Sequence, residues 1–199
     1  VLMAKYIDLE DFRLIMKEGK KRDLNPIIHI NRYEEGVDII IEYDKDHESY
    51  YNYLKEDSRH VKFDNYLEIE EDRIVAVVFV GSRDKLYSFY NLLNENYPNR
   101  FNSHVMENLN GPYALLEIMN PKVSKWLTLR EYAKEKNISP EEIITIGDDS
   151  NDIDMIKNSG LGICMKNGNS RVKSAAKIIT KYDNNNSGVA FELKRVLNI

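Results

Sequence analysis

The spacing of apolar residues predicts that the first part of the chain mixes helices with β-hairpins. Apolar side chains recur every three or four positions between Leu9 and Arg22, which indicates an amphipathic helix. Two β-branched stretches follow at 27–33 and 37–43, and the Glu-Glu-Gly turn between them predicts a hairpin. The apolar run Ile74–Val80 is the strongest strand signal, and we expect this strand to be buried on both faces.

The apolar pattern between the first hairpin and residue 120 again predicts helices and a strand pair. We predict helices at 47–58 and 84–96 and a strand pair at 101–107 and 113–119 around an Asn-Gly turn, whereas 63–69 fits no single element. Two similar half-units, each with a hairpin and a helix, indicate an α+β domain at residues 1–119 with its own core.

After residue 120 the pattern changes to short apolar runs that alternate with short amphipathic stretches. We predict strands at 143–146, 161–165 and 178–180, with the first buried on both faces. Helices are expected at 126–136, at 170–176, at 189–197 and from about residue 150 to 158. This alternation is typical of βαβ units, so we assign residues 120–199 to an α/β domain with a parallel sheet.

Composition excludes several classes of function. The 199 residues carry a net charge of -5 without a dense Lys/Arg block, so we expect no nucleic-acid partner. No apolar stretch approaches the roughly 20 residues that span a bilayer, so we expect no membrane partner either. A single cysteine and the lack of a signal-peptide pattern fit a cytoplasmic protein. Nothing in the sequence indicates the oligomeric state.

Polar residues with candidate chemistry gather directly after the predicted strand 143–146. They are Asp148, Asp149, Asn151, Asp152 and Asp154, and Ser150 or Asn151 is suited to begin the next helix. Ligands of open α/β sheets bind at the carboxyl ends of strands, and carboxylates are suited to hard cations such as Mg²⁺. The alternative for such a cluster taken alone is a solvated acidic loop.

Three stretches read together resemble a known family. Ser124-Lys125, Gly147-Asp148-Asp149-Ser150-Asn151-Asp152 and Gly162-Ile163-Cys164-Met165-Lys166-Asn167 are similar to the C-terminal motifs of the haloacid dehalogenase (HAD) superfamily. The Cof-type phosphatases, with a large α+β cap, match best. The resemblance implies that residues 1–119 are the cap and that residues 120–199 are the C-terminal part of a Rossmann-like α/β core with a parallel sheet.

The resemblance also implies roles for four residues. Asp148 takes the position of the direct Mg²⁺ ligand, and Asp152 would bind the metal or support its surroundings. Lys125 would be catalytic and contact the phosphate, and Asn151 would bind the phosphate as well. This set suits phosphoryl transfer, which requires neutralisation of charge on the transferred group. Asp149 and Asp154 are interpreted as surface charges.

One motif of the family has no counterpart in the sequence. The family's nucleophile lies in a DxDG-type motif, and the only superficial match, Asp44-Lys45-Asp46-His47, reads as a turn with an Asx cap. We therefore expect that these residues are a C-terminal piece of a longer protein and that they do not hydrolyse a phosphomonoester alone. Trp126 and Lys166 also occupy positions that are small in the family.

Two functions remain open at this point. The first is a Mg²⁺-dependent phosphatase for a small phosphorylated metabolite such as a sugar phosphate, which forms an aspartyl-phosphate on a segment absent from this sequence. The alternative is a non-catalytic binding or regulatory relative that keeps the cap and part of the metal site. A receiver-like phosphoacceptor domain is disfavoured, because an inserted α+β domain has no place in that fold.

Overall fold

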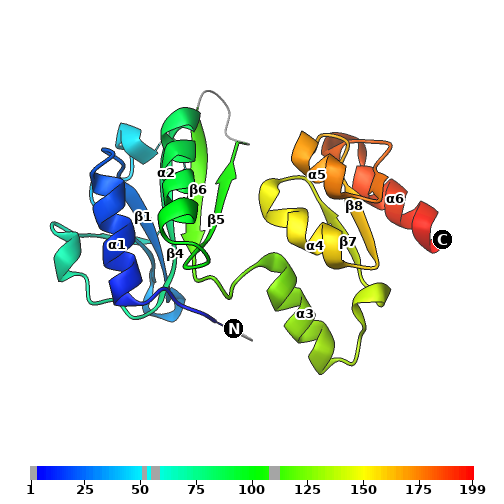
Figure 1. Cartoon of the computed structure of the whole chain (residues 1–199), viewed down its shortest axis with the longest axis horizontal. Coiled ribbons are helices and arrows are strands. Elements are labelled where there is room, and N and C mark those ends of the chain that lie inside the picture. Colours follow the sequence, from blue (N-terminus) through cyan, green and yellow to red (C-terminus); the bar gives the residue numbers. More distant parts are fainter. Residues whose placement is uncertain (1–3, 51–52, 55–58, 108–112) are drawn as a thin grey trace. The chain divides into compact units, whose positions relative to one another are not determined.

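The computed structural model describes residues 4–50, 53–54, 59–107 and 113–199 (Figure 1). The chain forms two compact units, residues 1–123 and residues 124–199. Each unit has its own sheet, so the two are described separately.

The first unit is built on a six-stranded sheet with the order β3-β2-β1-β4-β6-β5. Its strands are β1 (Pro26–Arg32), β2 (Val37–Ile41), β3 (His60–Lys62), β4 (Ile74–Ser82), β5 (Asn102–Met106) and β6 (Tyr113–Met119). All neighbours are antiparallel except β2 and β3. The predicted hairpin, the central strand and the second strand pair are therefore confirmed, while the Asn-Gly turn falls on residues 108–112, outside the described part.

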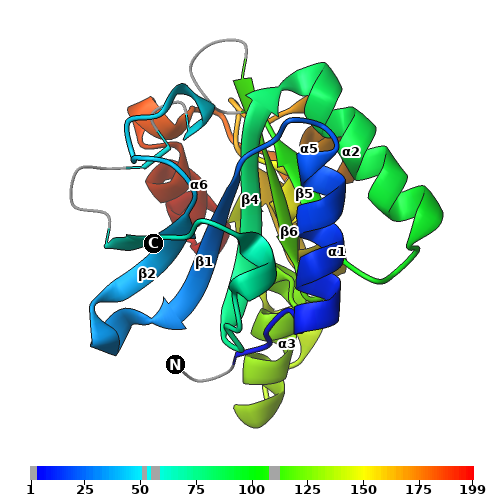
Figure 2. The same ribbon diagram turned by 90° about the vertical axis from the view of Figure 1, so that its left-hand side faces the viewer.

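Helices α1 (Leu9–Lys20) and α2 (Arg83–Asn96) cover one face of this sheet (Figure 2). Both were expected from their periodicity. Phe12 of α1 and Phe89 of α2 are completely buried against strand residues such as Phe79. Burial of these large side chains drives the packing, at about 1.5–3 kcal/mol for each. Every residue of the run Ile74–Val80 is buried except Val75, as the sequence predicted.

The helix predicted at 47–58 is wrong for the part that the structure describes. Only a 3₁₀ turn, Glu48–Tyr50, forms there, and residues 51–52 and 55–58 lie outside the described residues. The hydroxyl oxygen of the fully buried Tyr50 accepts hydrogen bonds from the backbone N–H groups of Glu42 and Tyr43. These bonds hold Tyr50 against the residues that follow β2 (Val37–Ile41).

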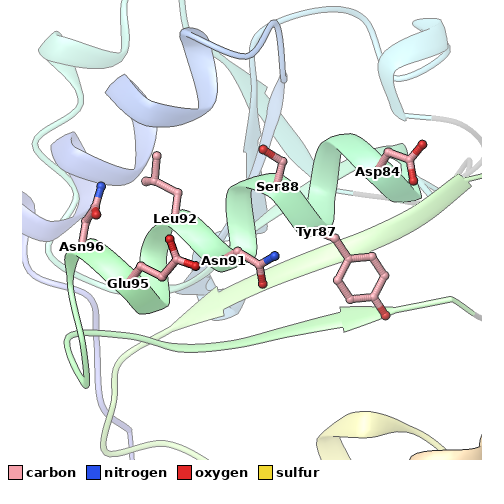
Figure 3. Close-up of a pocket in the computed structure, with 7 residues that line it drawn as sticks. All are labelled: Asp84, Tyr87, Ser88, Asn91, Leu92, Glu95 and Asn96. Carbon is pink, nitrogen blue, oxygen red and sulfur yellow. The ribbon is translucent and has the colours of Figure 1, made fainter.

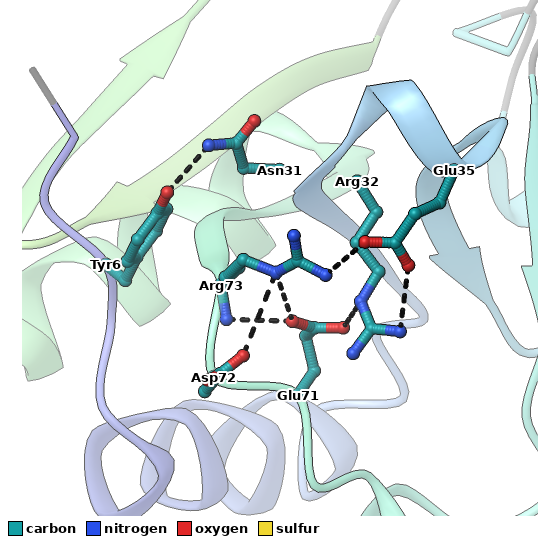
Figure 4. Close-up of polar contacts among 7 residues, drawn as sticks. All are labelled: Tyr6, Asn31, Arg32, Glu35, Glu71, Asp72 and Arg73. Carbon is teal, nitrogen blue, oxygen red and sulfur yellow. Dashed lines mark hydrogen bonds and ion pairs between the residues drawn. The ribbon is translucent and has the colours of Figure 1, made fainter. Parts of the chain in front are cut away.

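Charged side chains form a cluster of ion pairs and hydrogen bonds at one end of this sheet (Figure 4). Glu71 is 5% exposed, and its carboxylate lies 2.6 Å from Nε of Arg32 and accepts a 2.8 Å bond from the backbone N–H of Arg73. The guanidinium of Arg73 also pairs with Glu35, in the β1–β2 turn, at 2.6 Å. A buried carboxylate requires such compensation, and here the two arginines provide it while tying the turn to the segment before β4.

The second unit contains the parallel sheet β7-β8-β9, as predicted. The strands are β7 (Ile144–Gly147), β8 (Leu161–Cys164) and β9 (Ile178–Ile179), and the helices are α3 (Lys125–Glu135), α4 (Ile153–Asn158), α5 (Ser170–Ala175) and α6 (Gly188–Leu197). Short 3₁₀ turns precede β7 at Pro140–Glu142 and follow it at Ser150–Asp152. Ser139 and Glu142 form a capping box at the first of these turns.

The burial of β7 differs from the prediction. Thr145 and Gly147 are buried, but Ile144 and Ile146 are only partly buried, so the strand is not enclosed on both faces. β7 is one of the two edge strands of this sheet, and α4 packs against it. No helix in the described residues is long and apolar enough to cross a membrane.

Candidate functional site

The candidate site is the loop that follows β7, and its shape depends on Gly147. A Cβ atom at this position would lie 2.4 Å from Cβ and 2.6 Å from Oδ2 of Asp152. These separations are far below van der Waals contact, so only glycine lets the Asp152 side chain pack against the end of the strand. The Gly-Asp pair of the motif therefore has a steric basis.

Asp152 organises the loop around its carboxylate. The side chain is buried, and Oδ2 accepts hydrogen bonds from the backbone N–H groups of Asp148 at 2.9 Å and Asp149 at 3.2 Å. These bonds satisfy donors at the start of a helical turn, which would otherwise be left without partners. Asp152 thus shapes the loop directly.

Asp149 is also part of this framework, and its interpretation as a surface charge is wrong. It is 7% exposed and caps the turn Ser150–Asp152, because its side chain accepts the N–H of Ser150 at 2.7 Å. A second bond comes from Nδ2 of Asn169 at 2.9 Å. The predicted caps, Ser150 and Asn151, are thus replaced by Asp149, which forms a capping box with Asp152. Asp154 is exposed, as expected.

Lys125 meets this loop although it lies 27 residues before Asp152. It is the first residue of α3, and its Nζ atom lies 2.6 Å from Oδ1 of Asp152 and 3.3 Å from Oδ1 of Asn151. The side chain of Lys125 is about half exposed, at 52%, so its ammonium remains accessible to a ligand. Three of the four predicted site residues are therefore in direct contact.

Asp148 is the fourth, and its environment concentrates negative charge. Partial burial raises the pKa of its carboxyl group, the neighbouring carboxylates of Asp152 and Asp149 raise it further, and Lys125 opposes the shift. Asp148 forms no salt bridge with any described residue. Its carboxylate is therefore the acidic group of this loop that is left for a cation, because Asp152 already binds Lys125 and two backbone amides.

The donor set can be compared with the needs of Mg²⁺. Across the part of the chain that the structure describes, no three His, Cys, Asp or Glu side chains are arranged to enclose a metal. Mg²⁺ commonly binds one or two protein carboxylates and completes its octahedral shell with water and phosphate oxygens. Asp148 as a direct ligand, with Asp152 supporting the loop, fits this mode of binding.

Asn169 is a residue that the sequence reading did not single out. It is the N-cap of α5, where its side chain accepts the N–H of Val172 at 3.0 Å, and it also bonds to Asp149. Its position directly before Ser170 is a helix-start signal that could have identified the cap. Its bond to the loop could not have been found from local spacing.

Two hollows occur elsewhere in the described residues. One of about 550 Å³ lies along α2 in the first unit and is lined by Asp84, Tyr87, Ser88, Asn91, Leu92, Glu95 and Asn96 (Figure 3). Another of about 610 Å³ lies in the second unit, where the end of α3 and residues 137–143 line it. Neither contains a predicted site residue, so the chemistry remains with the loop after β7.

Part of the chain is similar in sequence to known phosphatases. Phosphatase YwpJ of Bacillus subtilis is 37% identical over 81 residues, which are 41% of this chain and 28% of YwpJ. A phosphoglycolate phosphatase of Methanoculleus marisnigri is 36% identical over 66 residues, or 33% of this chain and 28% of that protein. The match thus covers 28% of the length of each of these relatives.

A solved structure and a family model extend the match to nearly the whole chain. The structure of a haloacid dehalogenase-like hydrolase from B. subtilis superposes with a TM-score of 0.76 at 18% identity, over 96% of this chain and 72% of that one, which shows a shared fold. The model of the haloacid dehalogenase-like hydrolases matches residues 1–193. With its acidic loop after β7 and the lysine of α3 bound to it, the chain belongs to the haloacid dehalogenase-like hydrolase family.

Proposed function

We propose that this chain is part of a Mg²⁺-dependent phosphatase that acts on small phosphorylated metabolites such as sugar phosphates. The observation that carries the proposal is the contact of Lys125 with Asp152 and Asn151 beside the carboxylate of Asp148. An accessible ammonium and a carboxylate of raised pKa at one strand end suit a phosphate and its metal ion.

Each residue has a distinct part in this proposal. The ammonium of Lys125 binds phosphate oxygens, and Asp152 holds that ammonium in place. The amide of Asn151 orients the phosphate, and Asp148 would hold Mg²⁺. When bound, the metal would supply neutralisation of the charge on the phosphoryl group. In this proposal the acceptor is an aspartate on a segment absent from this sequence, because the superficial match to the family's nucleophile motif, Asp44-Lys45-Asp46-His47, reads as a turn with an Asx cap.

Mg²⁺ binding by this chain tests the proposal without any need for turnover. We expect a Mg²⁺ titration followed by ¹⁵N NMR to shift the amide signals of Gly147–Asp152, and Asp148→Asn to abolish the shifts. Asp154→Asn is the matched control, because Asp154 is an exposed carboxylate in the first turn of α4, close to the loop in sequence. If Asp148→Asn and Asp154→Asn changed the Mg²⁺-induced amide shifts equally, the assignment of Asp148 as the Mg²⁺ ligand would be contradicted.

A non-catalytic binding or regulatory role that keeps the first unit and part of the metal site is the second candidate. An assay of the protein with p-nitrophenyl phosphate and Mg²⁺ distinguishes the phosphatase from the non-catalytic role. We expect residues 1–199 alone to be inactive. Activity of this chain alone would show that the acceptor lies within it, whereas inactivity of the natural protein in a screen of phosphorylated metabolites would favour the regulatory role.

A further inference from the structure

The second unit contains a stretch whose charge differs from that of the rest of the chain. Residues 155–182 include no aspartate or glutamate, although the whole chain has a net charge of -5. The basic residues of this stretch are Lys157, Lys166, Arg171, Lys173, Lys177 and Lys181. All of residues 155–182 are described, and within the described structure none of these side chains pairs with a carboxylate, whereas Lys125 and Arg195 of the same unit do. The stretch therefore carries positive charge that the protein itself does not neutralise.

Two of these lysines lie beside each other at the carboxyl ends of neighbouring strands. Cys164 of β8 pairs with Ile179 of β9 in a parallel register. Lys166 and Lys181 each follow two residues later, so they occupy equivalent positions on the two strand ends. The backbone N–H of Lys166 also donates to Oγ1 of Thr180 at 2.8 Å, which fixes Lys166 next to the residue before Lys181. We call Lys166 and Lys181 the lysine pair.

Both ammonium groups of the lysine pair belong to exposed residues and lack a counterion. Nζ of Lys181 lies 5.3 Å from the ring centroid of Tyr182 and 5.6 Å from that of Phe191, and these contacts position the ammonium without neutralising it. The next acidic residue, Asp183, uses its carboxylate to accept the backbone N–H and the side-chain amide of Asn186. Like charges on adjacent strands repel each other, so an anion bound between the two lysines would stabilise this edge of the sheet.

The lysine pair adjoins the candidate site. The N–H of Met165 donates to the carbonyl of Gly147 at 2.9 Å, and the N–H of Asn169 donates to the carbonyl of Asp148 at 3.1 Å. The turn 166–168 between these two bonds is therefore held against the loop after β7. The strand order is β7-β8-β9, and adjacent strands lie about 5 Å apart, so the two lysines extend from strand ends that are about 5 and 10 Å from the end of β7.

We propose that the lysine pair binds a second anionic group of the substrate, a phosphate or a carboxylate, beside the phosphate at the candidate site. The inference rests on the proposed function and narrows its substrate class to phosphorylated metabolites with two separate anionic groups. Lys125 and Asp148 serve the first group, and the lysine pair serves the second. An ammonium binds an oxyanion as a point charge on a flexible stem, so the pair recognises charge and accepts either type of group.

The binding of three non-hydrolysable ligands to this chain tests the proposal without turnover. Ethylphosphonate has one anionic group, whereas carboxyethylphosphonate and ethylenediphosphonate add a second group on a similar carbon chain. Amide shifts in ¹⁵N NMR, recorded with Mg²⁺ present, give the three dissociation constants. We expect both two-group ligands to bind about fivefold more tightly than ethylphosphonate, because each gains two exposed ion pairs. A larger gain for ethylenediphosphonate would identify phosphate as the preferred second group, and a larger gain for carboxyethylphosphonate would identify carboxylate.

Substitution of the lysine pair should remove this preference. Lys166→Gln and Lys181→Gln should each reduce it to about twofold, and the double variant should bind all three ligands equally. Lys157→Gln is the matched control, because Lys157 is an exposed and unpaired lysine of the same basic stretch. It lies in the last turn of α4, close to the start of β8 and not to its carboxyl end, so the control should keep the full preference.

Equal affinities of the native chain for all three ligands, or no binding of any of them, would overturn the proposal. So would a preference that survives in the double variant or is lost in Lys157→Gln. Lys125→Gln separates this result from the proposed function, because it should weaken all three ligands by the same factor. If Lys125→Gln changed none of the affinities while the preference still depended on the lysine pair, the anion site would stand and the placement of phosphate at Lys125 would fail.

Discussion

Removal of the Asp152 side chain is the most informative single change to the second unit. In Asp152→Ala, the backbone N–H groups of Asp148 and Asp149 lose their acceptor, and Lys125 loses its ion pair. Each backbone bond contributes about 1 kcal/mol. The ion pair adds only about 0.5 kcal/mol, because the lysine is half exposed and water screens the charge.

These contributions sum to about 2.5 kcal/mol. The loss of charge repulsion with Asp148 and Asp149 offsets part of this, so we expect the free energy of unfolding to fall by about 2 kcal/mol. With a urea m-value of about 1 kcal/mol/M for a unit of this size, the urea midpoint should fall by about 2 M.

Trp126 makes the assay specific, because it is the only tryptophan and lies in α3 of the second unit. Its fluorescence during urea titration reports this unit even when the first unit unfolds separately. Asp154→Ala is the control and should shift the midpoint by less than about 0.5 M, as exposed substitutions do. If the Asp152 and Asp154 variants had the same midpoint, the argument that Asp152 supports the loop through these bonds would be refuted.

Three further predictions concern charge and sterics. Asp152→Asn should lower the pKa of Asp148, because it removes a neighbouring negative charge; ¹³C NMR titration measures this, and an unchanged or higher value would contradict it. Burial lowers the pKa of His29 below 6.5, so the unfolded state binds the proton more readily, and the stability of the first unit should fall as pH drops below about 6.5. Hydrogen exchange of the β1 amides at several pH values tests this, and His29→Gln should flatten the dependence; an equally steep fall in the variant would assign it to other groups. Gly147→Ala should destabilise the second unit by about 1–3 kcal/mol through its clash with Asp152, measured by the same urea titration, and a native midpoint would show that the loop can move aside.

Local sequence patterns predict an element correctly where the spacing of its apolar residues matches the side chains that it buries. The amphipathic spacing of α1 (Leu9–Lys20) and the continuous apolar run of β4 (Ile74–Ser82) both predicted the elements that form, because each buries its apolar residues in the core. The prediction of a helix at 47–58 is wrong in the described part, where the 3₁₀ turn Glu48–Tyr50 forms instead. There the hydroxyl of Tyr50 binds backbone N–H groups seven and eight residues away, and this tertiary contact overrides propensity.

At the candidate site, too, motifs in the sequence predict the residues, whereas only the fold provides the contacts between distant residues. Lys125, Asp148, Asn151 and Asp152 were named from motifs, yet local spacing alone does not bring Lys125 to Asp152. Asp149 was misread because an acidic residue in a polar loop is usually solvated. In the structure its carboxylate accepts a hydrogen bond from Asn169, which lies 20 residues further along the chain, and no local pattern predicts this contact.

The sequence by itself determined most of the helices and strands, the α+β and α/β character of the two parts, and the residue types at the strand end after Gly147. These are properties of neighbours along the chain, which periodicity and turn chemistry specify. Tertiary structure alone decided the strand order of the large sheet, the edge position of β7, and the use of Asp152 to hold both Lys125 and the loop backbone. The physical reason is that these features depend on which distant groups satisfy each other's hydrogen bonds and charges, and that choice is made only when the chain has folded.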